Sequence, residues 1–194
     1  HTFYNCPALK RVDYNGELST WCNIDFEDAS ANPLCQKGSF FVKGVEQTEI
    51  TIPSGVENIK QYAFCYYTSL TSVTIPDSVT SIGADAFYSC KSLTSITIPD
   101  SVTSIGDSAF RYCSSLTSVT IGNSVTSIGY SAFSNCSILK EVYCKPTTPP
   151  TGKGYMFSQN ASGRKIYVPT ASVEAYKSAT YWNTYASDIV GYDF

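Results

Sequence analysis

Residues 70–92 read LTSVTIPDSVTSIGADAFYSCKS, and residues 93–115 read LTSITIPDSVTSIGDSAFRYCSS. The two stretches are nearly identical, and their spacing of 23 residues continues on both sides. A repeat of this length is typical of a solenoid, in which each coil buries its apolar face only by stacking on neighbouring coils. The sequence therefore predicts one stacked array of coils.

Eight columns of side chains keep the 23-residue step, and five of them hold only isoleucine, valine or alanine. The other three are a leucine, a phenylalanine and a cysteine column, made of Leu70, Leu93, Leu116, Leu139, Phe64, Phe87, Phe110, Phe133, Cys90, Cys113 and Cys136. We expect all eight columns to form the structural core of the array.

Each repeat contains two short strand signals. The Val/Ile-Thr-Ile segment alternates apolar and polar residues and is rich in β-branched side chains, which indicates a half-buried strand. Pro76 and Pro99 end this strand, because proline cannot donate to a ladder of hydrogen bonds. A shorter Val-Thr-Ser-Ile segment follows and stops at Gly83 or Gly106. The Ala-Phe stretch is too short for a full helix and predicts one helical or 3₁₀ turn.

The repeat Leu-x-x-Ile-x-Ile-Pro-x-x-Val-x-x-Ile-Gly-x-x-Ala-Phe-x-x-Cys resembles the BspA-like class of leucine-rich repeats, found on bacterial and some protozoan surface proteins. The resemblance covers residues 47–142 and departs from the pattern at Gln47, Lys60, Tyr67 and Gly122. It implies an α/β-type leucine-rich repeat fold, a right-handed curved solenoid. Short strands would form a β-rich parallel sheet on the concave face, with helical or 3₁₀ turns on the other side.

The remaining segments divide the 194 residues into a single solenoid with irregular ends. We expect a partial repeat at 3–12, an insertion with a β-hairpin at 13–46, regular repeats at 47–142, a degenerate repeat at 143–169 and a small C-terminal helical cap at 170–194. Because the sequence starts in the middle of a coil, we expect a secretion signal or anchor upstream of His1.

Eight cysteines raise the question of disulfides. Cys6 joins Cys90, Cys113 and Cys136 in one column, where neighbours lie about one strand spacing apart, wider than the ~3.8 Å that a disulfide prefers between Cβ atoms. We therefore expect reduced thiols in this column. The better candidates for a bridge are Cys22 and Cys35, and also Cys65 and Cys144.

Composition excludes several classes of function. Charged residues make up 15% of the chain, against about 25% in an average soluble protein, and serine and threonine occupy 47 positions. The net charge is −3 and lysine and arginine form no cluster, so a nucleic-acid partner is disfavoured. The only histidine is His1, which argues against imidazole catalysis and His-ligated zinc. No apolar run approaches the ~20 residues of a membrane span.

Catalysis is not predicted. Asp77 and Asp100 share a column and could stand as close as a retaining glycosidase pair, but both follow proline at a turn, where aspartate is common. We expect no enzyme activity, no catalytic or metal-binding residues and no cofactor.

Binding through the exposed strand positions is the leading hypothesis, because solenoids bind through extended faces. The candidate face consists of Thr71, Ser72, Thr74, Thr94, Ser95, Thr97, Thr117, Ser118, Thr120, Lys140, Glu141 and Tyr143. A second candidate surface lies on the insertion at Trp21, Asp25 and Phe26, although these aromatic rings could instead cover a local core. The hydroxyl rows could also be an inert soluble surface.

The resemblance implies a non-enzymatic cell-surface or secreted adhesion module. Its partner would be a host matrix or cell-surface protein, or a glycan, with no membrane insertion by this segment, and the chain would be a monomer. The alternatives are a structural spacer that holds a missing N-terminal domain, and a carbohydrate-binding module.

Overall fold

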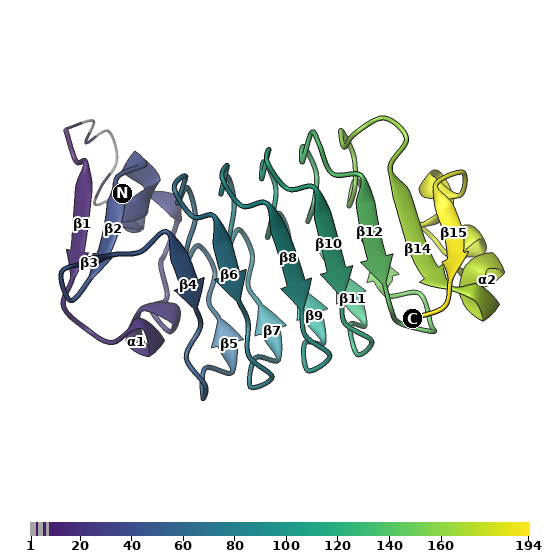
Figure 1. Cartoon of the computed structure of the whole chain (residues 1–194), viewed down its shortest axis with the longest axis horizontal. Helices are drawn as coiled ribbons and strands as arrows, with labels where there is room; N and C mark the ends of the chain where they lie inside the picture. The colour runs from purple at the N-terminus through teal and green to yellow at the C-terminus, as the bar shows by residue number, and fades with distance from the viewer. Residues whose placement is uncertain (1–2, 4–5, 7) are drawn as a thin grey trace.

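The computed structural model describes residues 3, 6 and 8–194, so part of the predicted partial repeat at 3–12 lies outside the described residues. The chain forms a β-solenoid whose coils follow one another along its long axis (Figure 1). Its N-terminal segment lies at one end and its C-terminal helix α2 at the other. This architecture confirms the predicted leucine-rich repeat solenoid with parallel strands and a small C-terminal helix.

The longer strand of each coil lies in what we call the main sheet. Its members are β4 (Glu49–Thr51), β6 (Ser72–Thr74), β8 (Ser95–Ile98), β10 (Ser118–Ile121), β12 (Glu141–Cys144), β14 (Lys165–Pro169) and β15 (Ile189–Tyr192). β4 pairs with β6, and β8, β10, β12, β14 and β15 pair in that order, all in parallel. Val119 lies between Ile96 and Val142 at the 23-residue step, whereas Glu141 pairs with Lys165, which is 24 residues later. β6 and β8 are joined more weakly, by a 3.4 Å bond from the Thr94 N–H to the Thr71 carbonyl.

The shorter strand signals form a second parallel sheet. It contains β5 (Asn58–Ile59), β7 (Ser81–Ile82), β9 (Ser104–Ile105), β11 (Ser127–Ile128) and β13 (Thr151–Gly152). The glycines that follow β7, β9 and β11 allow adjacent coils to approach closely, since a Cβ on Gly106 would lie 2.5 Å from the Ala84 nitrogen. Glycine at Gly83, Gly106 and Gly129 therefore allows the close spacing of the coils, besides ending the strand before it.

The Ala-Phe stretch forms consecutive tight turns instead of a regular helical turn. Residues on both sides of it, such as Tyr62 and Tyr66, have positive φ, which prevents the turn from continuing as a helix. Alternate N–H groups point to the next coil, and the Phe64 N–H bonds the Ala86 carbonyl at 2.8 Å. A third ladder of hydrogen bonds thus links the coils. At the two ends of the stack this ladder leaves backbone C=O or N–H groups without a partner coil.

The phenylalanine column is a continuous stack inside the solenoid. Phe64, Phe87, Phe110, Phe133 and Phe157 follow one another with ring centroids 5.2–5.5 Å apart and interplanar angles of at most 14°. All five are fully buried. Since interior packing is dense, this stack reinforces the spacing between coils that the sheets set.

The cysteine column is reduced where the structure describes it. The Cys90, Cys113 and Cys136 thiols are free, and each donates a hydrogen bond of 3.2–3.3 Å to a phenylalanine carbonyl of the preceding coil. Cys22, Cys35, Cys65 and Cys144 also carry free thiols, so none of the bridges considered for them is formed. Cys22 and Cys35, the better candidates for a bridge by sequence, are thus unbridged.

The N-terminal segment contains β1 (Arg11–Tyr14), α1 (Leu18–Cys22), two 3₁₀ helices η1 (Ala29–Ala31) and η2 (Pro33–Gln36), β2 (Ser39–Val42) and β3 (Val45–Glu46). β1 and β2 are parallel, whereas β2 and β3 form the predicted antiparallel hairpin. The Trp21 indole donates to the Ala63 carbonyl at 2.8 Å, and the Asn32 amide donates to the Tyr62 carbonyl at 2.6 Å. This segment therefore closes the N-terminal end of the third ladder.

The C-terminal segment closes the other end. A 3₁₀ helix η3 (Thr170–Ser172) leads into α2 (Val173–Ser178), followed by the 3₁₀ helix η4 (Asn183–Tyr185) and β15. Tyr176 and Trp182 are fully buried. The Tyr185 hydroxyl accepts from the Phe157 N–H at 3.2 Å, which satisfies a donor that would otherwise face a missing coil.

Candidate functional site

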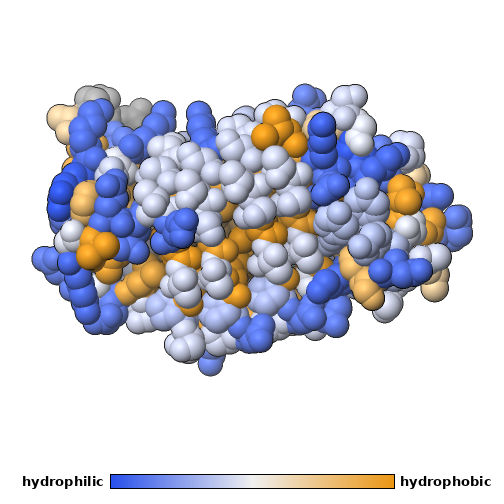
Figure 2. All heavy atoms as spheres, in the orientation of Figure 1, coloured by the Kyte–Doolittle hydropathy of each residue, from blue (hydrophilic) through white to orange (hydrophobic). Residues whose placement is uncertain are grey.

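The candidate face lies on the solvent side of the main sheet. Successive strands align its residues in rows, so that Thr97, Thr120 and Tyr143 are lateral neighbours. In the next row Ser95, Ser118 and Glu141 are neighbours. The middle of this face is covered by weakly polar side chains, with strongly hydrophilic residues toward its two ends (Figure 2). The repeat thus forms a hydroxyl-bearing surface that changes character at β12.

Two hydroxyls of the row Thr71, Thr94 and Thr117 are used by the solenoid itself. The Thr71 hydroxyl donates to the Thr48 carbonyl at 2.9 Å, and the Thr117 hydroxyl donates to the Thr94 carbonyl at 3.0 Å. These side chains connect adjacent coils and cannot donate the same hydrogen to a ligand. The other two rows, Ser72, Ser95, Ser118 and Thr74, Thr97, Thr120, make no side-chain hydrogen bond within the described part of the chain.

Aromatic rings gather where the hydroxyl rows end. Tyr143 on β12 stacks on Tyr167 of β14, with ring centroids 4.8 Å apart and an interplanar angle of 16°. Tyr192 of β15 packs its ring edge-to-face against both, at 5.6 and 5.5 Å, and Phe194 follows at 5.1 Å from Tyr192. We call Tyr143, Tyr167, Tyr192 and Phe194 the aromatic cluster.

Charged residues stand beside this cluster. Lys140 and Glu141 are exposed at the start of β12, and Glu141 pairs in register with Lys165 of β14. Partial burial, followed by the nearby Glu141 carboxylate, raises the pKa of the Tyr143 hydroxyl. Tyr143 therefore stays neutral at physiological pH and can both donate and accept hydrogen bonds.

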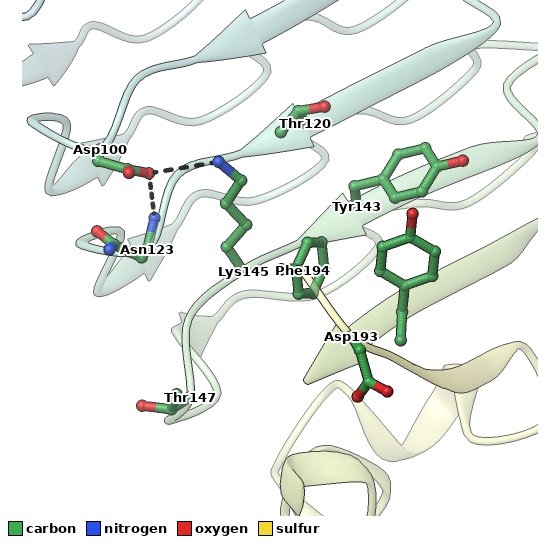
Figure 3. Close-up of a pocket in the computed structure, with 9 residues that line it drawn as sticks. Asp100, Thr120, Asn123, Tyr143, Lys145, Thr147, Asp193 and Phe194 are labelled. Carbon is green, nitrogen blue, oxygen red and sulfur yellow. Dashed lines mark hydrogen bonds and ion pairs between the residues drawn. The ribbon is translucent and has the colours of Figure 1, made fainter. Parts of the chain in front are cut away.

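A groove of about 690 Å³ opens between the aromatic cluster and the turns that follow β8 and β10 (Figure 3). On its polar side, the Asp100 carboxylate accepts from the Asn123 backbone N–H at 2.9 Å and lies 3.9 Å from the Lys145 ammonium. The residues that line the groove are Asp100, Thr120, Asn123, Tyr143, Lys145, Thr147, Tyr192, Asp193 and Phe194. Asp100 thus holds a turn of the next coil through this hydrogen bond, which agrees with the turn position that its place after proline predicted.

Sequence reasoning identified Tyr143 but missed Tyr167, Tyr192 and Phe194. The sequence did hold a signal for Tyr167, because Val142-Tyr143 recurs as Ile166-Tyr167. The recurrence comes after 24 residues instead of 23. Tyr192 could not be found in this way, because it pairs in register with Pro169 and reaches the cluster from a neighbouring strand position.

The insertion does not offer its aromatic rings to a ligand. Trp21 and Phe26 are 3% and 6% exposed, and Trp21 packs against Phe40 with ring centroids 4.5 Å apart. Only Asp25 of this candidate surface is exposed, and its carboxylate accepts from Gln61 at 3.2 Å. The proposal of an insertion binding surface was wrong for the two rings, because they cover the first coil.

Within residues 3, 6 and 8–194, no group of three or more histidine, cysteine, aspartate or glutamate side chains is placed to hold a metal ion. None of the helices in that range has the length and apolarity needed to cross a bilayer.

Comparison with known proteins agrees with this architecture. Six copies of the BspA type leucine rich repeat region match residues 37–162. A leucine-rich repeat protein from Eubacterium ventriosum is 29% identical with a TM-score of 0.56, over 69% of this chain and 38% of that one. The leucine rich repeat protein of T. pallidum is 26% identical with a TM-score of 0.58, over 74% and 68% of the two chains. No curated protein matches the sequence.

Proposed function

This chain belongs to the BspA-type leucine-rich repeat family, and from that premise we propose that it is a non-enzymatic adhesion module of the cell surface or the secreted space. It binds an extracellular protein through the exposed face of the main sheet. The contact is centred on the ring pair of Tyr143 and Tyr167, with Lys140, Glu141 and Lys165 around it.

The observation that carries this proposal is the half-buried stack of Tyr143 on Tyr167 at the end of the polar face of the main sheet. Tyrosine is enriched at protein interfaces, since it supplies a large contact area with few rotatable bonds and one polar group. The charges of both signs around the rings suit a polar rim, which steers association more than it adds affinity. The unbonded rows of Ser95 and Thr97 extend the polar surface away from this centre.

The test is a binding assay against a panel of purified, immobilised extracellular-matrix and cell-surface proteins. We expect at least one to bind, and Tyr167→Ala to weaken that complex by about tenfold or more, as for an interface anchor. Tyr112→Ala is the matched control, because Tyr112 is 37% exposed and lies on the turns outside the main sheet. The proposal fails if no panel protein binds, or if the Tyr167 and Tyr112 variants behave alike.

A second candidate function is that of a structural spacer. The hydroxyls of Thr71 and Thr117 support it, because they bind the preceding coil and strengthen the stack. A chain that binds nothing in the panel and remains a rigid monomer in solution scattering would fit the spacer better than the adhesion module.

A further inference from the structure

The groove beside the aromatic cluster combines two chemically different walls. Figure 3 shows Tyr143 and Phe194 on one side, Asp100 and Asn123 on the other, and Lys145 reaching between them. Tyr192 also lines the groove. We propose that this groove binds a neutral saccharide, with one sugar ring against the aromatic wall and its hydroxyls toward Asp100, Asn123 and Lys145. Apart from Tyr143, these residues are not part of the protein-binding centre proposed above.

The aromatic wall suits the apolar C–H face of a sugar ring. Tyr143 is held by its stack on Tyr167 at 4.8 Å, and Tyr192 is held edge-to-face against Tyr143 at 5.6 Å. Phe194 is 52% exposed, so its ring presents apolar surface to the groove at little cost to the core. Rings that are already ordered lose little conformational freedom when a ligand binds.

The polar wall suits neighbouring hydroxyl groups. Asp100 uses one oxygen for the Asn123 N–H and the Lys145 ammonium, which leaves lone pairs to accept from a sugar hydroxyl. Lys145 has further N–H donors, and the Asn123 side chain accepts from Ser124 at 3.1 Å while its NH₂ group makes no hydrogen bond in the described structure. Adjacent donors and acceptors of this kind match hydroxyls, which both donate and accept.

Charge favours a neutral ligand. The Lys145 ammonium lies 3.9 Å from Asp100, and the Asp193 carboxylate accepts from the Thr170 hydroxyl at 2.7 Å. Lys145 is the only cation among the lining residues, and it is already beside a carboxylate, so a phosphorylated ligand would find no uncompensated positive charge. The volume of about 690 Å³ lies within the range of small-ligand sites.

The lining also favours a saccharide over an extended peptide. Peptides that add to a sheet are held chiefly by main-chain hydrogen bonds along a strand edge. The groups that converge here are side chains from three successive coils and from the C-terminal segment, and they line an open depression rather than one strand edge.

The experiment measures binding of neutral oligosaccharides of glucose, galactose, mannose and N-acetylglucosamine to the full chain by ligand-observed NMR and calorimetry. We expect at least one to bind, and Phe194→Ala and Lys145→Met each to weaken binding by about tenfold, since each removes one wall of the groove. Tyr181→Ala is the matched control, because Tyr181 is 48% exposed and does not line the groove. It should leave binding unchanged.

Absence of binding by every neutral oligosaccharide at millimolar concentration would overturn the proposal. So would equal binding by the wild type and the Phe194 and Lys145 variants, or competition by phosphorylated sugars or unstructured peptides but not by neutral ones. Circular dichroism of each variant shows that the fold is retained. Because Lys145 and Phe194 lie outside the proposed protein-binding centre, failure here leaves the protein-binding result intact, and the reverse also holds.

Discussion

The indole nitrogen of Trp21 donates a 2.8 Å hydrogen bond to the carbonyl oxygen of Ala63, 42 residues later in the chain. In every following coil, the equivalent carbonyl accepts from the N–H of the preceding coil, as Ala86 does from Phe64. Trp21 therefore occupies the place of a missing backbone donor. A side chain of the insertion thus substitutes for a coil at the N-terminal end of the stack.

We expect Trp21→Phe to lower the free energy of unfolding by about 1 kcal/mol, because it keeps most of the ring but leaves the Ala63 carbonyl with only the 3.2 Å contact from Asn32. Trp21→Ala should cost about 3–5 kcal/mol through the cavity that it creates. Urea unfolding measures both. Equal stability of the Phe variant and the wild type would mean that the indole hydrogen bond contributes nothing.

Deletion of residues 170–194 should cause aggregation. The deletion removes the buried rings of Tyr176 and Trp182 and the Tyr185 hydroxyl that accepts from the Phe157 N–H. The last coil would then expose both apolar surface and unpaired ladder groups. Light scattering after purification is the measurement. A soluble, monomeric deletion variant would show that this segment does not cap the solenoid.

Gly106→Ala should be strongly destabilising, by about 1–3 kcal/mol or more, because the new methyl group would lie 2.5 Å from the backbone nitrogen of Ala84. Gly154→Ala is the matched control, since its nearest neighbour is the Tyr130 ring at 3.6 Å. Thermal unfolding compares the two. Similar melting temperatures would contradict the close approach of coils at this column.

The buried thiols should make stability fall at alkaline pH. Burial raises the pKa of Cys22, Cys136 and Cys144 to about 12 from an ordinary value near 9, and raises the pKa of Cys113 well above that ordinary value. A thiol with a raised folded-state pKa stays protonated in the folded chain while the unfolded chain ionises. The contribution of such a thiol to the free energy of unfolding is complete below pH 9 and is lost as the pH rises toward its folded-state pKa.

Each such thiol should reduce the free energy of unfolding by about 1.4 kcal/mol per pH unit between pH 9 and the folded-state pKa. Cys113→Ala removes one of them, so its stability should fall less steeply with pH than that of the wild type. Denaturant unfolding at a series of pH values measures the two slopes. Parallel profiles would refute the burial of an ionisable thiol at this position.

Asp85→Asn should stabilise the protein at neutral pH. Burial raises the pKa of Asp85 to about 6, an effect that Arg111 opposes and Asp107 reinforces. The folded-state pKa lies above the ordinary value of 3.8, so the stability present below pH 3.8 is lost as the pH rises through 6. Asparagine also tolerates the φ of 52° at this residue.

Thermal unfolding at pH 7.5 and at pH 4 measures the effect of this variant. We expect a higher melting temperature than wild type at pH 7.5 and a much smaller difference at pH 4. Asp77→Asn is the control, since Asp77 is exposed. This variant should differ from wild type in melting temperature by the same amount at pH 7.5 and at pH 4. An Asp85 variant that is less stable than wild type at pH 7.5 would contradict the prediction.

Repetition in the sequence determined the coil, the parallel strands, the inward columns and the outward hydroxyl rows. Each of these follows from local alternation and from a fixed 23-residue step, so that one repeat such as 93–115 predicts its neighbours. The leucine, phenylalanine and cysteine columns are buried for this reason. The candidate face at Thr97 and Thr120 could be placed on the solvent side by the same argument.

Only the tertiary structure decided what happens where the repetition stops. An end coil has unpaired backbone groups and exposed core, and which side chains satisfy them depends on the path of irregular segments that no period constrains. Trp21 is therefore buried against Ala63 instead of being offered to a ligand. For the same reason Tyr192 and Phe194 line the groove beside Tyr143, although the residue paired with Tyr192 on the preceding strand is Pro169 and not an aromatic residue.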